Sequence, residues 1–155
     1  MDEQKQLRAH LSELLEGKFA HIDVESALER FPVEKINAKI ENFPHTAWHL
    51  LEHIRIAQWD ILEFSRDSEH VSPEFPDGYW NLTDGTAETW KKSAAQILEN
   101  LQEMRDLVAD EKNDLFRKIP HGDGQTLLRE TLLACDHAAY HLGQIMVLQK
   151  IFDAE

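Results

Sequence analysis

Apolar residues recur every three or four positions through most of this chain, which is the spacing of one face of an α-helix. The clearest stripe lies near the middle of the chain, where Leu50, Ile54 and Ile61 share one helical face. The same spacing predicts helices over residues 2–16, 24–30, 44–65, 86–110 and 125–151. No region alternates apolar and polar residues for long enough to predict a sheet. The pattern therefore predicts an all-α protein with four long helices and one short one.

The connection over residues 66–85 is long and irregular. It holds two prolines and two glycines, which interrupt helices, and it also holds Tyr79 and Trp80. Antiparallel neighbours need only a few residues between them, whereas about twenty residues fit a crossover along a bundle. We therefore predict a single domain over residues 1–155, a four-helix bundle of up-down-down-up topology. The aromatic residues of the crossover are expected to pack over the bundle or to form one wall of a pocket.

Composition and charge narrow the classes of partner. Hydrophobic residues make up 42% of the chain, as in ordinary globular proteins. The formal net charge of −13 argues against nucleic acid and against an anionic membrane surface as partners. Cys135 is the single cysteine, which excludes an intrachain disulfide and suits a reducing compartment. The first residues lack the pattern of a signal peptide and no apolar run is long enough to span a membrane, so we expect a soluble cytoplasmic protein.

The most informative polar residues are two histidines in the last predicted helix. His137 and His141 are four residues apart, so both imidazoles leave the same helical face one turn apart. Ala134, Ala138 and Leu142 place this pair on or beside the apolar stripe. Two such nitrogens can bind one metal ion if a third ligand comes from elsewhere in the chain.

Three histidines in the second long helix are candidates for that third ligand. His45, His49 and His53 recur every four residues and share one slowly drifting stripe, so spacing alone does not select among them. His45 lies beside Pro44 at the predicted helix start, where it could cap the helix. His53 lies at the edge of the apolar face, where a buried imidazole needs a partner. On the residues alone we rank His53 first and His49 second.

Other kinds of metal or catalytic site fit the sequence less well than a site of three histidines. No histidine has a glutamate three residues before it, and the H-E-x-x-H pattern is absent. Cys135 lies two residues before His137, so it faces another side of the helix and is read as a small buried residue. Neighbours that could contact the metal ligands or line a pocket are Glu52, Arg55, Asp136 and Gln144.

These histidine-containing segments resemble the DinB-like superfamily of four-helix metalloproteins. The resemblance is carried by residues 44–60, by Tyr79-Trp80 and by residues 129–144. It implies that the metal ligands are His53, His137 and His141, and that His49 is not a ligand. It also implies the up-down-down-up bundle, a divalent ion (often zinc or nickel) and frequent homodimers. Related sequences carry a longer aromatic tail, whereas this one stops at Glu155.

Two functions remain open at this stage. The resemblance includes transferases and isomerases that use low-molecular-weight thiols, which implies a metal-dependent enzyme that acts on a small-molecule substrate. A site of three imidazoles leaves an ion with its full positive charge and with open positions, which favours a bound thiolate over a thiol. The alternative is a non-catalytic, metal-stabilised module that binds a ligand or partner. A pocket that reaches the metal would favour the enzyme, and a closed site would favour the module.

Overall fold

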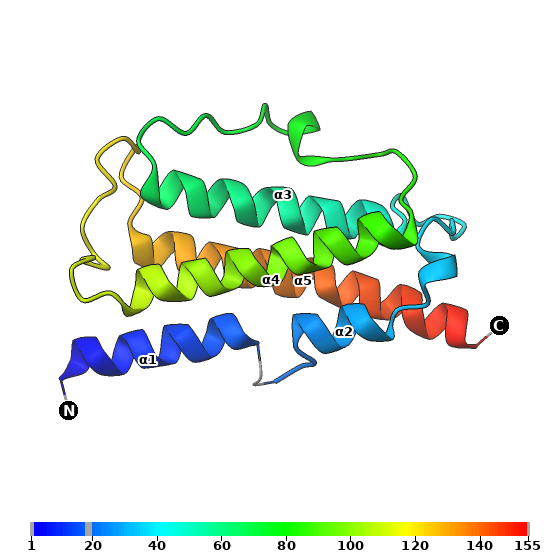
Figure 1. Ribbon diagram of the computed structural model, residues 1–155, viewed down its shortest axis with the longest axis horizontal. Helices are drawn as coiled ribbons and strands as arrows, with labels where there is room; N and C mark the ends of the chain where they lie inside the picture. Colours follow the sequence, from blue (N-terminus) through cyan, green and yellow to red (C-terminus); the bar gives the residue numbers. More distant parts are fainter. Residues whose placement is uncertain (1, 18–19, 155) are drawn as a thin grey trace.

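The computed structural model describes residues 2–17 and 20–154, which form an arrangement of helices (Figure 1). The α-helices are α1 (Glu3–Glu16), α2 (Val24–Arg30), α3 (Ala47–Arg66), α4 (Ala87–Ala109) and α5 (Leu127–Asp153). Two short 3-10 helices, η1 (Val33–Lys35) and η2 (Asp77–Tyr79), lie in the connections. The described residues contain no strand, only one isolated bridge between Lys118 and Thr126. The prediction of an all-α protein is therefore confirmed.

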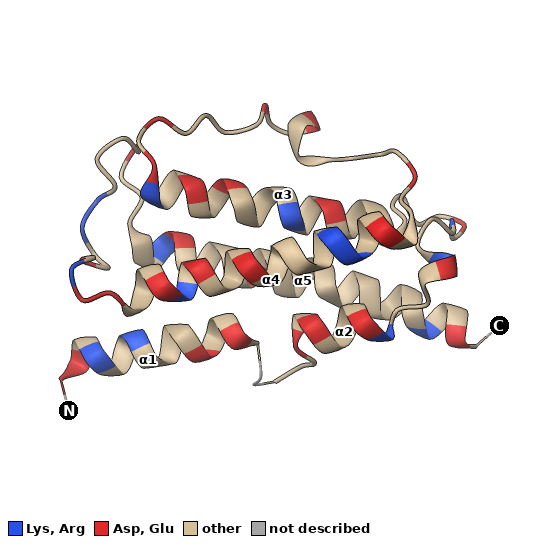
Figure 2. Ribbon diagram, viewed as in Figure 1, with Lys and Arg blue, Asp and Glu red and all other residues tan. Residues whose placement is uncertain are grey.

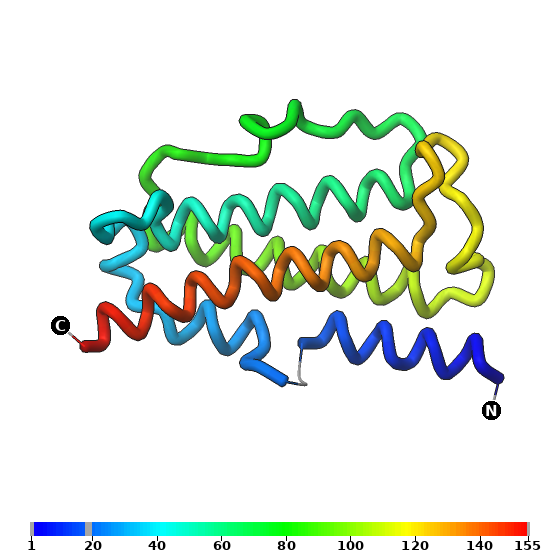
Figure 3. The backbone as a smooth tube through the Cα atoms, turned by 180° about the vertical axis from the view of Figure 1, so that it is seen from behind, coloured from blue at the N-terminus to red at the C-terminus, as the bar shows by residue number. Residues whose placement is uncertain are grey.

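The three long helices α3, α4 and α5 lie side by side, and α1 and α2 follow one another along a fourth row (Figures 1 and 3). Helix α3 packs against both α4 and α5, and α1 packs mainly on α4. In Figure 1 the chain runs in one direction through α3 and α4, and in the opposite direction through α1 and α5. The crossover between α3 and α4 returns along the outside of α3, so it covers the helix that carries His49 and His53.

The start of α3 differs from the prediction, and the difference decides the role of two histidines. The helix begins at Ala47 rather than near Pro44, because Thr46 caps it: the Thr46 hydroxyl accepts from the His49 amide at 3.2 Å. In return, Nδ1 of His49 accepts from the Thr46 amide at 3.4 Å, which completes a capping box. His45 therefore lies outside the helix, and its expected role as the cap is wrong.

The crossover is fastened where it joins α4. The Asn37 side chain exchanges hydrogen bonds with the backbone of Gly85, donating to its carbonyl at 2.8 Å and accepting from its amide at 2.9 Å. A Cβ at position 85 would lie 2.4 Å from Cδ2 of the buried Trp48, so only glycine fits this close approach. The end of the crossover is thus packed directly onto the start of α3.

One continuous apolar core joins all five α-helices. Its innermost side chains, each less than 2% exposed, include Leu50, Ile54, Ile97, Ile145 and Leu148. Acidic residues occur on every α-helix, and Lys and Arg lie among them (Figure 2). None of the described helices combines the length and apolar character that crossing a membrane requires.

Candidate metal centre

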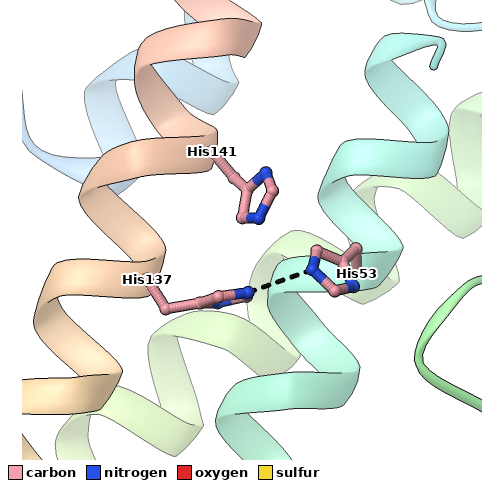
Figure 4. A group of neighbouring side chains, drawn as sticks. All are labelled: His53, His137 and His141. Atoms are coloured by element: carbon pink, nitrogen blue, oxygen red, sulfur yellow. Dashed lines mark hydrogen bonds between the residues drawn. The ribbon is translucent and has the colours of Figure 1, made fainter. Parts of the chain in front are cut away.

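Helix α3 carries His53 two turns beyond the Thr46 cap. The apolar face of α3 packs against α4 and α5, and His53 lies at its edge, half-buried, beneath the crossover. Because helix α5 is the neighbour on that side, the imidazole of His53 points toward α5 (Figure 4). His53 therefore lies at the edge of the apolar stripe, as the sequence predicted.

Helix α5 carries His137 and His141 one turn apart, and both side chains point toward His53 (Figure 4). The ring centroids of His137 and His141 are 4.6 Å apart, and those of His53 and His141 are also 4.6 Å apart. The third pair, His53 and His137, is separated by 4.7 Å. One nitrogen from each ring lies within 4.8 Å of the others, and no carboxylate of the described residues joins the group. We refer to these three residues as the histidine triad.

Hydrogen bonds select the tautomer of two members of the triad. Nδ1 of His53 lies 2.9 Å from the backbone carbonyl oxygen of Tyr79, and because a carbonyl only accepts, this nitrogen carries the proton. Nδ1 of His141 lies 2.7 Å from Oε1 of Gln144 and donates to it in the same way. Each ring therefore presents the lone pair of Nε2, the form in which a histidine binds a metal ion.

His137 is the third member of the triad and lies one turn before His141 on α5. Its Nε2 lies 3.0 Å from Nε2 of His53 (Figure 4). Two nitrogens that share one tetrahedral ion, each about 2.1 Å from it, are separated by about 3.4 Å, so these two nitrogens are close enough to reach a common ion after a small shift. Nδ1 of His137 is buried and has no hydrogen-bond partner among the described residues. The ring is thus held by packing and by its neighbours in the triad rather than by an acceptor of its own.

The triad is electrically neutral at neutral pH. The pKa of His137 is lowered to about 4, mainly by burial and to a smaller extent by the nearby His141 and His53. Burial also lowers the pKa of His53 and of His141, although their hydrogen bonds to Tyr79 and Gln144 act in the opposite direction. Neutral imidazoles are available as ligands without first losing a proton, so protons compete only weakly for this site.

Trp80 covers the triad from the crossover. Its indole stacks on His53 with ring centroids 3.9 Å apart and planes 2° from parallel. His45 stacks on the opposite face of the same indole, at 4.0 Å and 12°. The edge of the Trp80 ring also meets His141, with centroids 6.2 Å apart. The indole is therefore enclosed between two imidazoles and forms an apolar wall beside His53 and His141.

The residues present suit a divalent cation. Three neutral nitrogens come from two helices, two of them have their lone pairs fixed by a hydrogen bond at the other ring nitrogen, and an apolar wall lies alongside. Such a donor set matches zinc, nickel, copper or iron and does not match magnesium or calcium, which prefer oxygen ligands. Three protein ligands leave further coordination positions for a small molecule.

Comparison with known protein families supports this interpretation. A family model described as the DinB superfamily matches residues 18–145, which is most of the chain. The chain belongs to the DinB superfamily. Comparisons with curated proteins and with solved structures find no significant match. The resemblance inferred from the histidine-containing segments is therefore confirmed at the level of the family.

In this DinB-superfamily chain, one of the four predicted neighbours contacts the triad. Gln144 holds His141, as described above. Glu52 instead points toward α4, where its carboxylate accepts from Ser93 at 2.6 Å and from Arg55 at 2.7 Å. Asp136 lines an apolar cavity beside α1. The expected roles of Glu52, Arg55 and Asp136 beside the metal are therefore not supported by these contacts.

The two remaining candidates, His49 in α3 and His45 just before it, have distinct positions in this member of the DinB superfamily. His49 is 8% exposed and is engaged in the cap of its own helix, and it is not part of the triad. His45 stacks on the face of the Trp80 indole opposite to the face that contacts His53. The ranking of His53 above His49 thus agrees with where the side chains lie.

Sequence reasoning missed the residues that fasten the crossover over the triad. Oδ2 of the buried Asp60 accepts from the Tyr79 hydroxyl at 2.6 Å, and its Oδ1 is 2.8 Å from Nε2 of His70. The pKa of Tyr79 is raised to about 12, mainly by burial and also by the bond to Asp60, so the phenol remains a donor. A buried aspartate on an otherwise apolar helical face was the signal that could have pointed to this contact.

Proposed function

We propose that this DinB-superfamily protein is a metal-dependent enzyme whose triad holds a divalent ion, most simply zinc or nickel. The enzyme would use a low-molecular-weight thiol as nucleophile in an S-transfer reaction on a small-molecule substrate. Its principal support is that three neutral Nε2 atoms from two helices converge, with no carboxylate among the described residues joining them. Membership of the family is a second support.

The chemistry follows from the charge of the donor set. A divalent ion among three neutral imidazoles would keep its full charge and would lower the pKa of a thiol beside it, so that the thiolate dominates at neutral pH. The sulfur would form a bond to an electrophilic carbon of the substrate, the leaving group would depart with its electron pair, and the thiol proton would pass to solvent. The chain contributes the three ligands, their fixed tautomers and the apolar wall of Trp80, which keeps water from one side of the site.

The nucleophile has to be external, because the chain's own thiol is unsuited to the task. Burial raises the pKa of Cys135 to about 11, so it is a thiol at neutral pH. Cys135 also lines a cavity of about 410 Å³ together with Leu14 and Leu101, between α1, α4 and α5. Cys135 therefore lies among packed helices, away from the triad. A small soluble thiol would supply the nucleophile instead.

The second candidate is a non-catalytic module in which the metal stabilises the bundle. It is favoured by the closure of the site: His141 is 8% exposed, and Trp80 lies over the rings. The cavity of about 530 Å³ beneath the crossover is lined by residues such as Arg55, Glu63 and Asn100 rather than by the triad. In this case a metal ion would raise stability, and thiols would have no effect on it.

Three finer features belong to the same proposal. The directions of the helices in Figure 1 support an up-down-down-up four-helix bundle in which α1 and α2 together take the place of the first helix. We also propose a homodimer, since the resemblance implies one and α5 exposes apolar side chains. The third is that His53, His137 and His141 are themselves the ligands of the ion, which the closeness of their ring nitrogens supports.

Cobalt substitution tests the function directly. Protein prepared without an affinity tag is depleted of metal, loaded with Co²⁺ and titrated with cysteine, glutathione or bacillithiol. Thiolate binding at the metal is expected to produce a new near-ultraviolet charge-transfer band that saturates with thiol. The control is His53→Ala, which should show no band because a ligand is missing.

The outcome separates the two candidates. A saturable band, together with thiol-dependent turnover of electrophilic test substrates, supports the transferase. If cobalt binds and raises the melting temperature while no thiol changes its spectrum, the enzyme proposal is refuted and the stabilised module is preferred.

A further inference from the structure

Three side chains tie the crossover to α3. The carboxylate of Asp60, which is 8% exposed, is bonded on one oxygen to the Tyr79 hydroxyl at 2.6 Å and on the other to His70 Nε2 at 2.8 Å. Both partners belong to the crossover, and neither is a lysine or an arginine. We refer to Asp60, His70 and Tyr79 as the Asp60 clasp. A buried carboxylate with these donors makes charge-assisted hydrogen bonds, which are stronger than neutral ones.

The clasp lies on the same face of α3 as the metal ligand. Asp60 follows His53 by seven residues, close to two helical turns, so both side chains leave α3 toward the crossover. Tyr79 connects them: its hydroxyl is held by Asp60, and its backbone carbonyl accepts from Nδ1 of His53 at 2.9 Å. One residue therefore joins the carboxylate to the ligand.

The next residue adds a second contact. Trp80 follows Tyr79 directly and stacks on the same imidazole at 3.9 Å. These two contacts of the crossover with His53 thus come from Tyr79, which belongs to the clasp, and from its direct neighbour Trp80. Apart from the short helix η2, the crossover has no regular structure to hold these residues in place. A loop that orients a metal ligand needs fixed attachment points, because metal affinity depends on the orientation of each ligand.

We propose that Asp60 is a positioning residue for the metal centre. Asp60 binds the Tyr79 hydroxyl and so holds the crossover close to α3. In this position the Tyr79 carbonyl accepts the proton on Nδ1 of His53, which leaves Nε2 free as a ligand. Without the carboxylate, Tyr79 and Trp80 shift, His53 samples both tautomers, and its ring loses its fixed orientation. The proposal rests on the proposed role of His53 as a metal ligand, but the tautomer of His53 can be measured without any metal.

The test compares two clasp variants with two matched controls. Asp60→Asn keeps the shape of the side chain and removes its charge, and Tyr79→Phe removes one hydroxyl. The matched controls are Asp136→Asn, an exposed aspartate beside His137, and Tyr140→Phe, an exposed tyrosine whose ring meets His141 with centroids 4.8 Å apart. Each control makes the same chemical change near the triad but outside the clasp.

Two measurements are made on each protein. Nitrogen-15 NMR of the metal-depleted protein identifies which ring nitrogen of His53 carries the proton. Competition with a chromophoric chelator gives the affinity for Co²⁺. We expect Nδ1 protonation in the wild type and in the controls, a mixture of tautomers in both clasp variants, and a cobalt affinity that is about tenfold lower in those variants.

The results separate this inference from the proposed function. If both clasp variants retain the Nδ1 tautomer and the wild-type cobalt affinity, Asp60 only anchors a loop and the proposal is overturned. If the wild type binds no cobalt, the metal proposal fails, and the tautomers alone then decide whether the clasp positions His53. Should Asp60→Asn fail to fold, Tyr79→Phe decides by the same two readouts, since it removes only one hydroxyl.

Discussion

At the scale of single residues, the triad depends on which nitrogen each histidine offers. Sequence spacing brought His137 and His141 together and placed His53 at the edge of the apolar stripe, and the fold agrees on all three positions. It could not specify the Tyr79 carbonyl that selects the tautomer of His53, because a backbone acceptor has no side-chain signature. The sequence indicated Gln144 only as one of four residues that could contact the metal ligands or line a pocket, and it did not single out its bond to His141.

Alanine substitution should distinguish the ligands from the other histidine of α3. Replacing His53, His137 or His141 by alanine is expected to lower metal affinity by at least about 100-fold, since even the loss of a contact that orients a ligand costs about 10–100-fold. His49→Ala should keep its metal and lose about 1 kcal/mol of stability, because it removes one half of the capping box. Elemental analysis and thermal unfolding of the four variants measure both effects. Full metal content in His53→Ala, or loss of metal in His49→Ala, would refute the assignment.

At the scale of the helices and their connections, apolar spacing was a good guide and local capping was not. The predicted helices agree with α1 to α5 because each buries a stripe at helical spacing in one core. The start of α3 was misplaced because Pro44 looks like a first helical residue, whereas the Thr46 side chain supplies the actual cap. The length of the connection predicted a crossover along the bundle, but the contacts that hold it were not predictable, because they join residues far apart in sequence, such as Asn37 and Gly85.

Gly85 offers a test of how tightly the crossover is packed on α3. Gly85→Ala would place a Cβ within 2.4 Å of Trp48, and overpacking of this kind costs about 1–3 kcal/mol. For a chain of this size, a loss of 1 kcal/mol lowers the melting temperature by about 2–4 °C. Asp84→Ala is the control, because the neighbouring Asp84 is exposed and should tolerate the change. Equal melting temperatures for the two variants would show that the crossover moves away from Trp48 without cost.

At the scale of the whole molecule, the fold changes the reason for expecting a dimer. Large apolar residues around α3, including Trp48, Trp59 and Phe64, are more than one inward stripe is expected to bury, which by itself would favour a dimer. That reason does not hold: Trp48 is 3% exposed, Trp59 packs against His70, and Phe64 packs against His121. Several exposed apolar side chains lie along an outer face of α5, while others, such as Val71 and Phe75, lie on the crossover. Leu132 is 45% exposed, Tyr140 is 65% exposed and Val147 is 52% exposed.

We predict that two copies of the chain associate through this outer face of α5. Light scattering at micromolar concentration is expected to give about twice the chain mass of 18.0 kDa. Val147→Glu should shift the protein toward the single chain, because it adds a negative charge to the shared face. Phe75→Glu, on the crossover at 84% exposure, is the control that should leave the dimer intact.

Each chain carries a formal net charge of −13, so the two copies repel one another. Raising the salt concentration should therefore strengthen the dimer by screening that repulsion. A mass of one chain at both low and high salt would rule out the dimer.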